Sequence, residues 1–182
     1  GPVCSAIFCA ARPWFATRSF PPRFEGREIG SGAGINLMIA RSHYDLGGVH
    51  VGPRPGAIAF PPDWRDNHPP QHMIEFANLK GCDVAPVDLT DPAQALRLKA
   101  YIWPEHHVRF ERMAAAIAAA TEAPPLLVHA NAADFVETEL LRPQADGTTR
   151  LLLHSIIWQI CPAAPQTPNP SARETTGPPG NP

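Results

Sequence analysis

The residues most able to do chemistry are an acid and three glycines in EIGSGAG, residues 28–34. Glycine lacks a Cβ, so it permits a sharp backbone turn and lets a ligand approach the main chain closely. The following INLMIARSHY can form a helix with Ile35, Met38 and Ile39 on one side. The first N–H groups of such a helix would be free to bind a carboxylate or a phosphate. The segment therefore predicts a ligand-binding turn, and its alternative is a purely structural loop before a helix.

The spacing of the glycines limits which ligand this turn could hold. A dinucleotide fingerprint, G-x-G-x-x-G, would place its third glycine at position 35, where the chain has Ile35. A P-loop needs Gly-Lys followed by Ser or Thr, and the sequence contains no such triplet. The spacing of Glu28, Gly30, Gly32 and Gly34 instead resembles the first motif of S-adenosylmethionine-dependent methyltransferases. In those enzymes the turn holds the methionyl and ribose parts of the cofactor, so the resemblance implies S-adenosylmethionine as a small-molecule cofactor.

Polar residues later in the chain occur in the order that this resemblance implies. An acid should end the second strand and bind the ribose hydroxyls, and GCDVAP offers Asp83. A polar residue after the third strand should meet the adenine, and HANAAD offers Asn131 or Asp134. Each has a structural alternative. Asp83 could cap a turn, and Asn131 could be a helix N-cap with Asp134 completing a capping box.

One histidine interrupts an apolar run at a place where a catalytic base could lie. TTRLLLHSIIWQI, residues 148–160, is almost continuously apolar, which predicts a strand buried on both faces. Open parallel sheets bind ligands at the carboxyl ends of their strands, so His154 is a candidate general base. The alternative is a core histidine bonded to a neighbouring carbonyl. No G-x-S-x-G elbow or Ser-His-Asp order indicates a hydrolase.

The other histidines do not predict a metal site. His68 and His72 lie in a proline-rich loop with no acid cluster nearby. His106 and His107 are adjacent, so on a helix they would point about 100° apart and could not hold one metal together. The acceptor substrate stays open, because no motif identifies it.

Composition excludes several other partners. With 15 basic and 17 acidic residues the formal charge is −2, and no aromatic-basic stripe indicates nucleic acid. No apolar run approaches the ~18 residues of a membrane-spanning helix. The four cysteines form no C-x-x-C pair, which favours reduced thiols and a cytoplasmic location.

The elements that must position these candidates alternate between strands and helices. Residues 44–51 predict a hairpin around Gly47-Gly48, residues 57–60 a further strand, and residues 73–89 one or two strands. One helix is predicted after the cap Asp91, and a second from Pro104 to about Glu122, with Phe110, Met113 and Ile117 as its apolar stripe. A strand at residues 126–129 and a third helix over residues 132–141 follow. This alternation predicts an α/β fold with right-handed crossovers.

The prolines divide the chain into three parts. Residues 161–182 contain seven of the 23 prolines and few apolar side chains, so we expect a disordered tail. Residues 1–26 carry arginines without helical or strand periodicity, and we expect a poorly ordered segment there. The domain is therefore predicted over residues 27–160.

Four segments in order, EIGSGAGINL, GCDVAPVDLTD, LRLKAYIWPEHHVRF and LLLHSIIWQ, resemble the bacterial domain-of-unknown-function family 2332 from about Arg27 to Gln159. The resemblance implies a Rossmann-like, methyltransferase-type parallel sheet with helices on both faces and an inserted β-hairpin. Family members are longer, so we expect a sheet that is incomplete, with both ends truncated or read out of frame. The functional expectation is an S-adenosylmethionine-binding protein of the methyltransferase type. Its alternative is a non-catalytic, truncated or frame-shifted remnant with no ligand.

Overall fold

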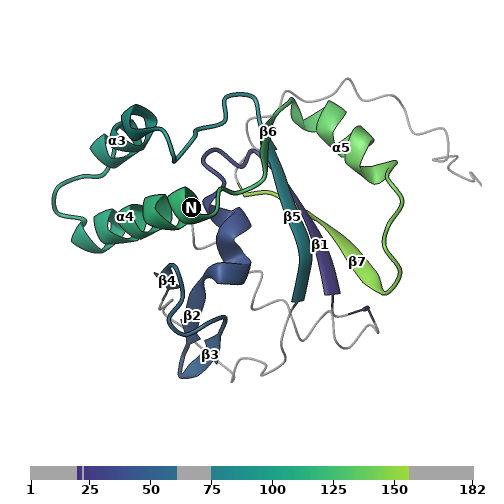
Figure 1. Ribbon diagram of the computed structural model, residues 1–182, viewed down its shortest axis with the longest axis horizontal. Helices are drawn as coiled ribbons and strands as arrows, with labels where there is room; N and C mark the ends of the chain where they lie inside the picture. The colour runs from purple at the N-terminus through teal and green to yellow at the C-terminus, as the bar shows by residue number, and fades with distance from the viewer. Residues whose placement is uncertain (1–19, 22, 61–74, 156–182) are drawn as a thin grey trace, which may run out of the picture.

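A four-stranded parallel sheet forms the centre of the chain (Figure 1). The computed structural model describes residues 20–21, 23–60 and 75–155. The strands lie in the order β6-β5-β1-β7, and every neighbouring pair is parallel. They span Leu127–His129 (β6), Glu75–Asp83 (β5), Arg23–Ile29 (β1) and Thr148–Leu153 (β7).

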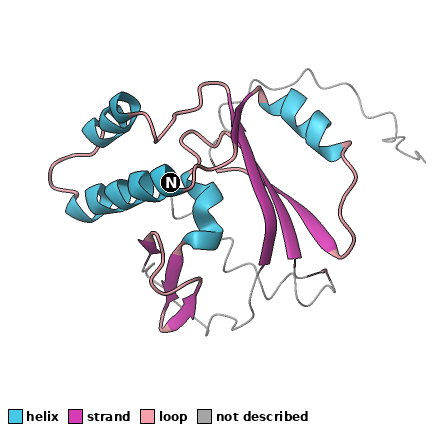
Figure 2. Cartoon of the chain, in the orientation of Figure 1, coloured by secondary structure: helices cyan, strands magenta, loops and turns pink. Residues whose placement is uncertain are grey.

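Helices cover both faces of this sheet, which confirms the predicted α/β class (Figure 2). On one face, the 3₁₀ helix η1 (Ile35–Arg41) and the helix α4 (His107–Glu122) share a core with side chains of β5 and β7. On the other face, Phe135 of α5 (Ala132–Leu140) packs against Ile29 of β1 and Cys82 of β5. The connections from β1 to β5 and from β5 to β6 therefore cross on one face of the sheet. The connection from β6 to β7, through α5, crosses on the opposite face.

The predicted hairpin is confirmed and belongs to a small second sheet. Strand β2 (His43–Leu46) pairs antiparallel with β3 (Val49–Val51) and parallel with β4 (Ala59–Phe60). Its apolar side chains join the main core, where the rings of Tyr44 and Phe60 stack with centroids 5.1 Å apart.

Local start signals place two helices where the sequence predicts them. Asp91 caps α3 (Pro92–Ala100), accepting hydrogen bonds from the N–H groups of Ala93 and Gln94, and the Gln94 side chain donates back to its carboxylate over 3.1 Å. Asn131 caps α5 by accepting a hydrogen bond from the Asp134 N–H. These helices begin where short side chains satisfy otherwise free N–H groups.

The buried face of α4 differs in part from the predicted stripe. The helix begins at His107 rather than Pro104, and its buried residues are Ala116, Ala119 and Ala120, while Phe110 is 46% exposed. Alanines let a helix approach a neighbouring layer closely, and here they pack beside the aromatic core of the small sheet. Ile117 of the predicted stripe packs against this core and Met113 is half-buried, so the stripe is confirmed in part, and of its three residues only Phe110, near the start of the helix, is exposed.

The central strand β1 buries three charged residues, Glu25, Arg27 and Glu28. Such a strand normally reads as an aliphatic run, and β1 begins at Arg23, before the domain start predicted at residue 27. The partner strand β7 ends at Leu153, and Leu152 is 46% exposed, so β7 is not buried on both faces. Residues 156–160 and the two predicted disordered ends (apart from residues 20, 21 and 23–26) lie outside the described residues.

No helix in the described ranges is long and apolar enough to cross a membrane.

Candidate functional site

The glycine segment forms the predicted sharp turn at the carboxyl end of β1. Gly30, Gly32 and Gly34 have φ angles of 68°, 58° and 68°, all in the left-handed region that glycine adopts at little cost. A Cβ added at Gly34 would lie 3.0 Å from Cγ of Pro125, whereas a Cβ at Gly32 would meet nothing within 4 Å. The main chain at Gly32 is therefore open to an approaching group.

The helix predicted after the turn is present as a 3₁₀ helix. Residues Ile35–Arg41 form a seven-residue 3₁₀ helix whose first bond runs from the Leu37 N–H to the Gly34 oxygen, at 3.1 Å. A 3₁₀ helix this short leaves fewer N–H groups free at its start than an α-helix does, and its dipole is smaller. The ligand site at that helix start therefore stays a prediction, to which the structure adds an open main chain at Gly32.

Asp83 joins three segments at this edge of the sheet. Its Oδ2 accepts a hydrogen bond from the Gly32 N–H over 2.8 Å, and its Oδ1 accepts one from the Ala85 N–H over 2.9 Å. Its main-chain oxygen accepts from the N–H of Ala130, just before α5, over 3.1 Å. The alternative that Asp83 caps a turn is confirmed by the bond to Ala85. The same carboxylate also holds the glycine turn.

Glu28 places a buried carboxylate directly before the turn. The residue is 3% exposed, and its Oε1 accepts a hydrogen bond of 2.7 Å from the Asn36 side chain of η1. Its Oε2 is buried and has no hydrogen-bond partner among the residues that the structure describes. Burial raises the pKa of Glu28, and the negative charge of Asp83 adds to this, against the hydrogen bonds from Asn36 and Ser31. A buried carboxylate oxygen without a hydrogen-bond partner, next to a glycine turn, is a feature typical of functional sites.

Asn131 and Asp134 reach the same edge through Ala130, but their side chains bond each other. The Asn131 Oδ1 accepts from the Asp134 N–H over 2.9 Å, and the Asn131 amide donates to the Asp134 carboxylate. The alternative of a helix cap is therefore confirmed for this pair. Contact with an adenine ring would require at least one of these bonds to be exchanged.

His154 follows β7 at the edge where the glycine turn begins. The β1–β7 pairing ends with Glu28 opposite Leu153, so the next residue, His154, lies at the level of Ile29. His154 is exposed, so it is not the buried core histidine of the alternative interpretation. Strands β1 and β7 flank the point where the crossovers change faces, and open α/β sheets bind ligands at such a point.

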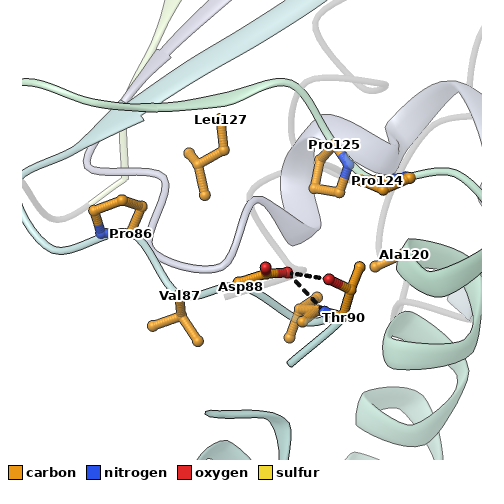
Figure 3. A pocket seen from close by; sticks show the side chains of 9 residues that line it. Pro86, Val87, Asp88, Thr90, Ala120, Pro124, Pro125 and Leu127 are labelled. Atoms are coloured by element: carbon orange, nitrogen blue, oxygen red, sulfur yellow. Dashed lines mark hydrogen bonds between the residues drawn. The ribbon is translucent and has the colours of Figure 1, made fainter. Parts of the chain in front are cut away.

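A cavity of about 330 Å3 lies beside the turn (Figure 3). It is lined by residues 86–90, Ala120, Pro124, Pro125 and Leu127. The Val87 N–H donates to the Gly32 oxygen over 3.0 Å, which ties this wall to the turn. None of the predicted site residues lines the cavity, and no sequence motif indicates it because its walls, residues 86–90 and 120–127, are distant in the sequence.

Within the described parts of the chain, no three histidine, cysteine or acidic side chains are grouped so that they could hold a metal ion.

Together these features define an α/β protein with a parallel sheet and a glycine turn held by an aspartate at its carboxyl edge. A family model described as "Uncharacterized protein conserved in bacteria (DUF2332)" matches residues 4–169. The chain belongs to this family, and the match extends beyond the stretch from Arg27 to Gln159 on both sides. No curated protein and no solved structure matches the chain significantly.

Proposed function

We propose that the chain binds S-adenosylmethionine at the carboxyl edge of the sheet and uses it as a methyl donor. The observation that carries this proposal is the 2.8 Å hydrogen bond from the Gly32 N–H to Asp83. It joins the glycine turn after β1 to the acid that ends β5, as the resemblance to methyltransferases implies.

The topology supports a Rossmann-like fold of this type. Numbered along the chain, the sheet strands lie in the order third, second, first, fourth, with crossovers on opposite faces. That is the order of the first four strands of the doubly wound nucleotide-binding folds, whose ligands lie outside the carboxyl ends of the strands. The glycine turn, Asp83 and His154 all lie at that end.

The side chains present fit the cofactor. The open space over Gly32 admits a ligand against the main chain, and the Oε2 of Glu28, unpartnered among the described residues, is an acceptor at the start of the same turn. An ionised carboxylate has about four acceptor sites, so Asp83 retains capacity for ribose hydroxyls beyond its two N–H bonds. Asn131 or Asp134 would contact the adenine. When bound, the cofactor supplies an electrophilic methyl group, and His154 would accept a proton from the methyl acceptor.

Calorimetric titration of S-adenosylmethionine into the full chain tests the proposal. We expect saturable binding below millimolar ligand, and weaker binding by adenosine alone, which lacks the methionyl part. If millimolar S-adenosylmethionine gives no binding heat, the proposal fails and the alternative of a remnant without a ligand is favoured.

A matched pair of glycine variants locates the site. Gly32→Ala and Gly147→Ala both place a Cβ at positive φ, 58° and 69°, with nothing within 4 Å. Each should cost about 1–2 kcal/mol of stability for the left-handed backbone. Only Gly32→Ala projects a methyl group into the space over the turn, so it should weaken binding at least tenfold while Gly147→Ala leaves it unchanged. Equal affinities of the two variants would move the site away from the turn.

A further inference from the structure

A cluster of five charged side chains lies between the sheet and α5, on the face opposite η1. We call it the α5 charge network, and it consists of Glu25, Arg27, Lys80, Glu139 and Arg150. Glu139 of α5 accepts from Arg27 Nε and Lys80 Nζ, each over 2.7 Å. Glu25 accepts from Arg150 Nη2 over 2.9 Å. The network takes no part in the site at the glycine turn.

The network carries one positive charge in excess, because three cations face two carboxylates. Although burial opposes it, hydrogen bonds from Lys80 and Arg27 hold the pKa of Glu139 below its ordinary value. Hydrogen bonds from Arg150 and the Ala145 N–H do the same for Glu25, so both acids are ionised at neutral pH. An uncompensated charge in a nearly buried position costs free energy.

Arg27 has a donor group that this network leaves unused. The residue is 8% exposed, its Nε bonds Glu139, and its Nη1 bonds the Gly26 oxygen and Asn78. Its Nη2 lies 3.9 Å from Oε2 of Glu25, too far for a hydrogen bond, and bonds nothing else in the described part of the chain. By contrast, Arg150 donates to several main-chain carbonyls as well as to Glu25.

A cavity of about 290 Å3 adjoins this arginine. Arg27, Glu139 and Arg150 line it on the charged side, and its apolar walls come from α5 and β7: Val136, Leu140, Leu151 and Leu152. Glu139 is already paired with Arg27, Lys80 and Arg142, so its charge is compensated within the lining. The cavity therefore combines a cationic end with an apolar body, and its volume is at the lower end of the range of small-molecule sites.

We propose that this cavity binds a small organic carboxylate with an apolar chain or ring, anchored on Arg27. A carboxylate would accept hydrogen bonds from Nη2 and compensate the excess positive charge, since guanidinium and carboxylate groups are complementary in shape. The leucine and valine walls would bury the apolar body. This site is independent of the cofactor site proposed at the carboxyl edge of the sheet.

Titration of the full chain with three probes of different chemistry tests the proposal. Octanoate has both required parts, octylamine has the same chain with the opposite charge, and inorganic phosphate is an anion without an apolar body. We expect octanoate to bind at least tenfold more tightly than the other two. Octylamine binding as tightly as octanoate would show a purely apolar cavity, and phosphate binding as tightly would show a plain anion site. Either result, or no octanoate binding, overturns the proposal.

Two neighbouring leucines supply a matched control at the end of α5. Leu140 lines the cavity and is 57% exposed, whereas Leu141 does not line it and is 79% exposed. Leu140→Trp fills the cavity without touching the charges and should weaken octanoate binding at least tenfold, while Leu141→Trp should not. Arg27→Lys keeps the charge but removes Nη2, and should weaken binding to a similar degree. Unchanged octanoate affinity in Leu140→Trp would contradict the location.

Discussion

Glu25 and Glu28 lie three residues apart on the same central strand, yet their surroundings differ in kind. Glu25 belongs to the α5 charge network, where Arg150 pairs with it and its pKa is lowered. Glu28 faces η1 on the other side, bonds an uncharged amide, and has a raised pKa because of its burial. The pairing of Glu25 with a cation stabilises the fold, whereas the raised pKa of Glu28 and its Oε2, unpartnered among the described residues, are typical of acids at functional sites.

The largest effect is expected from Glu139→Gln, which removes the shared anion of the α5 charge network. Lys80 would lose its carboxylate partner, and Arg27 would keep only the 3.9 Å contact with Glu25. Breaking a buried ion pair from one side costs about 3–5 kcal/mol, so urea denaturation should show a loss of that order. A loss under ~1 kcal/mol, the value typical of surface ion pairs, would show that the α5 charge network contributes no more than a surface ion pair. The energetic difference between Glu25 and Glu28 would then not exist.

The same substitution at Glu28 should have the opposite sign at neutral pH. Its raised pKa means that ionisation of Glu28 disfavours the folded state, so Glu28→Gln should stabilise by about 1–3 kcal/mol at pH 7. The gain should vanish below about pH 4.5, where Glu28 is protonated in both states. It is measured as the difference in free energy of unfolding between variant and wild type across that range.

The paired acids should show the reverse pH dependence. Because the pKa values of Glu25 and Glu139 are lowered in the folded chain, their pairing contributes stability above about pH 4.5 that is lost as the pH falls through the folded-state values. Wild type should therefore lose stability on acidification, and Glu139→Gln should lose less over the same interval. An equal loss of unfolding free energy in both proteins would show that the α5 charge network does not cause the acid sensitivity.

The smallest effect is expected from Asn131→Ala, which removes the cap of α5. Loss of an N-cap costs about 1 kcal/mol. If Asn131 also contacts the adenine, S-adenosylmethionine affinity should fall with it. A matched cap deletion at Asp91→Ala, in α3, should cost a similar amount of stability and leave affinity unchanged. Equal affinities of the two variants would leave Asn131 as a cap only.

Features encoded over a few residues were predictable from the sequence. The hairpin at Gly47-Gly48 and the caps Asp91 and Asn131 depend on neighbours within three residues. The charged strand β1 was not, because its partners are distant: Arg27 meets Glu139 across 112 positions, and Glu25 meets Arg150 across 125. A strand that buries charge can be recognised only once those partners are placed beside it.

The candidate site divides in the same way. The order of glycine turn and acid along the chain assigns Gly32 and Asp83 to one cofactor site, and a hydrogen bond between the two brings them together. The unpartnered oxygen of Glu28 and the two cavities had no sequence signal, because each depends on the absence of an atom at a particular point in space.

The peptide groups of Gly32 are held from both sides, by Asp83 at the N–H and by Val87 at the oxygen. Any ligand that binds to the glycine turn will therefore also reduce the motion of the segment between β5 and α3. The Val87 amide becomes a remote reporter of occupancy, since its proton is donated to Gly32 rather than to the ligand. Its exchange with deuterated solvent should slow when the turn is occupied, in step with the fraction of bound protein.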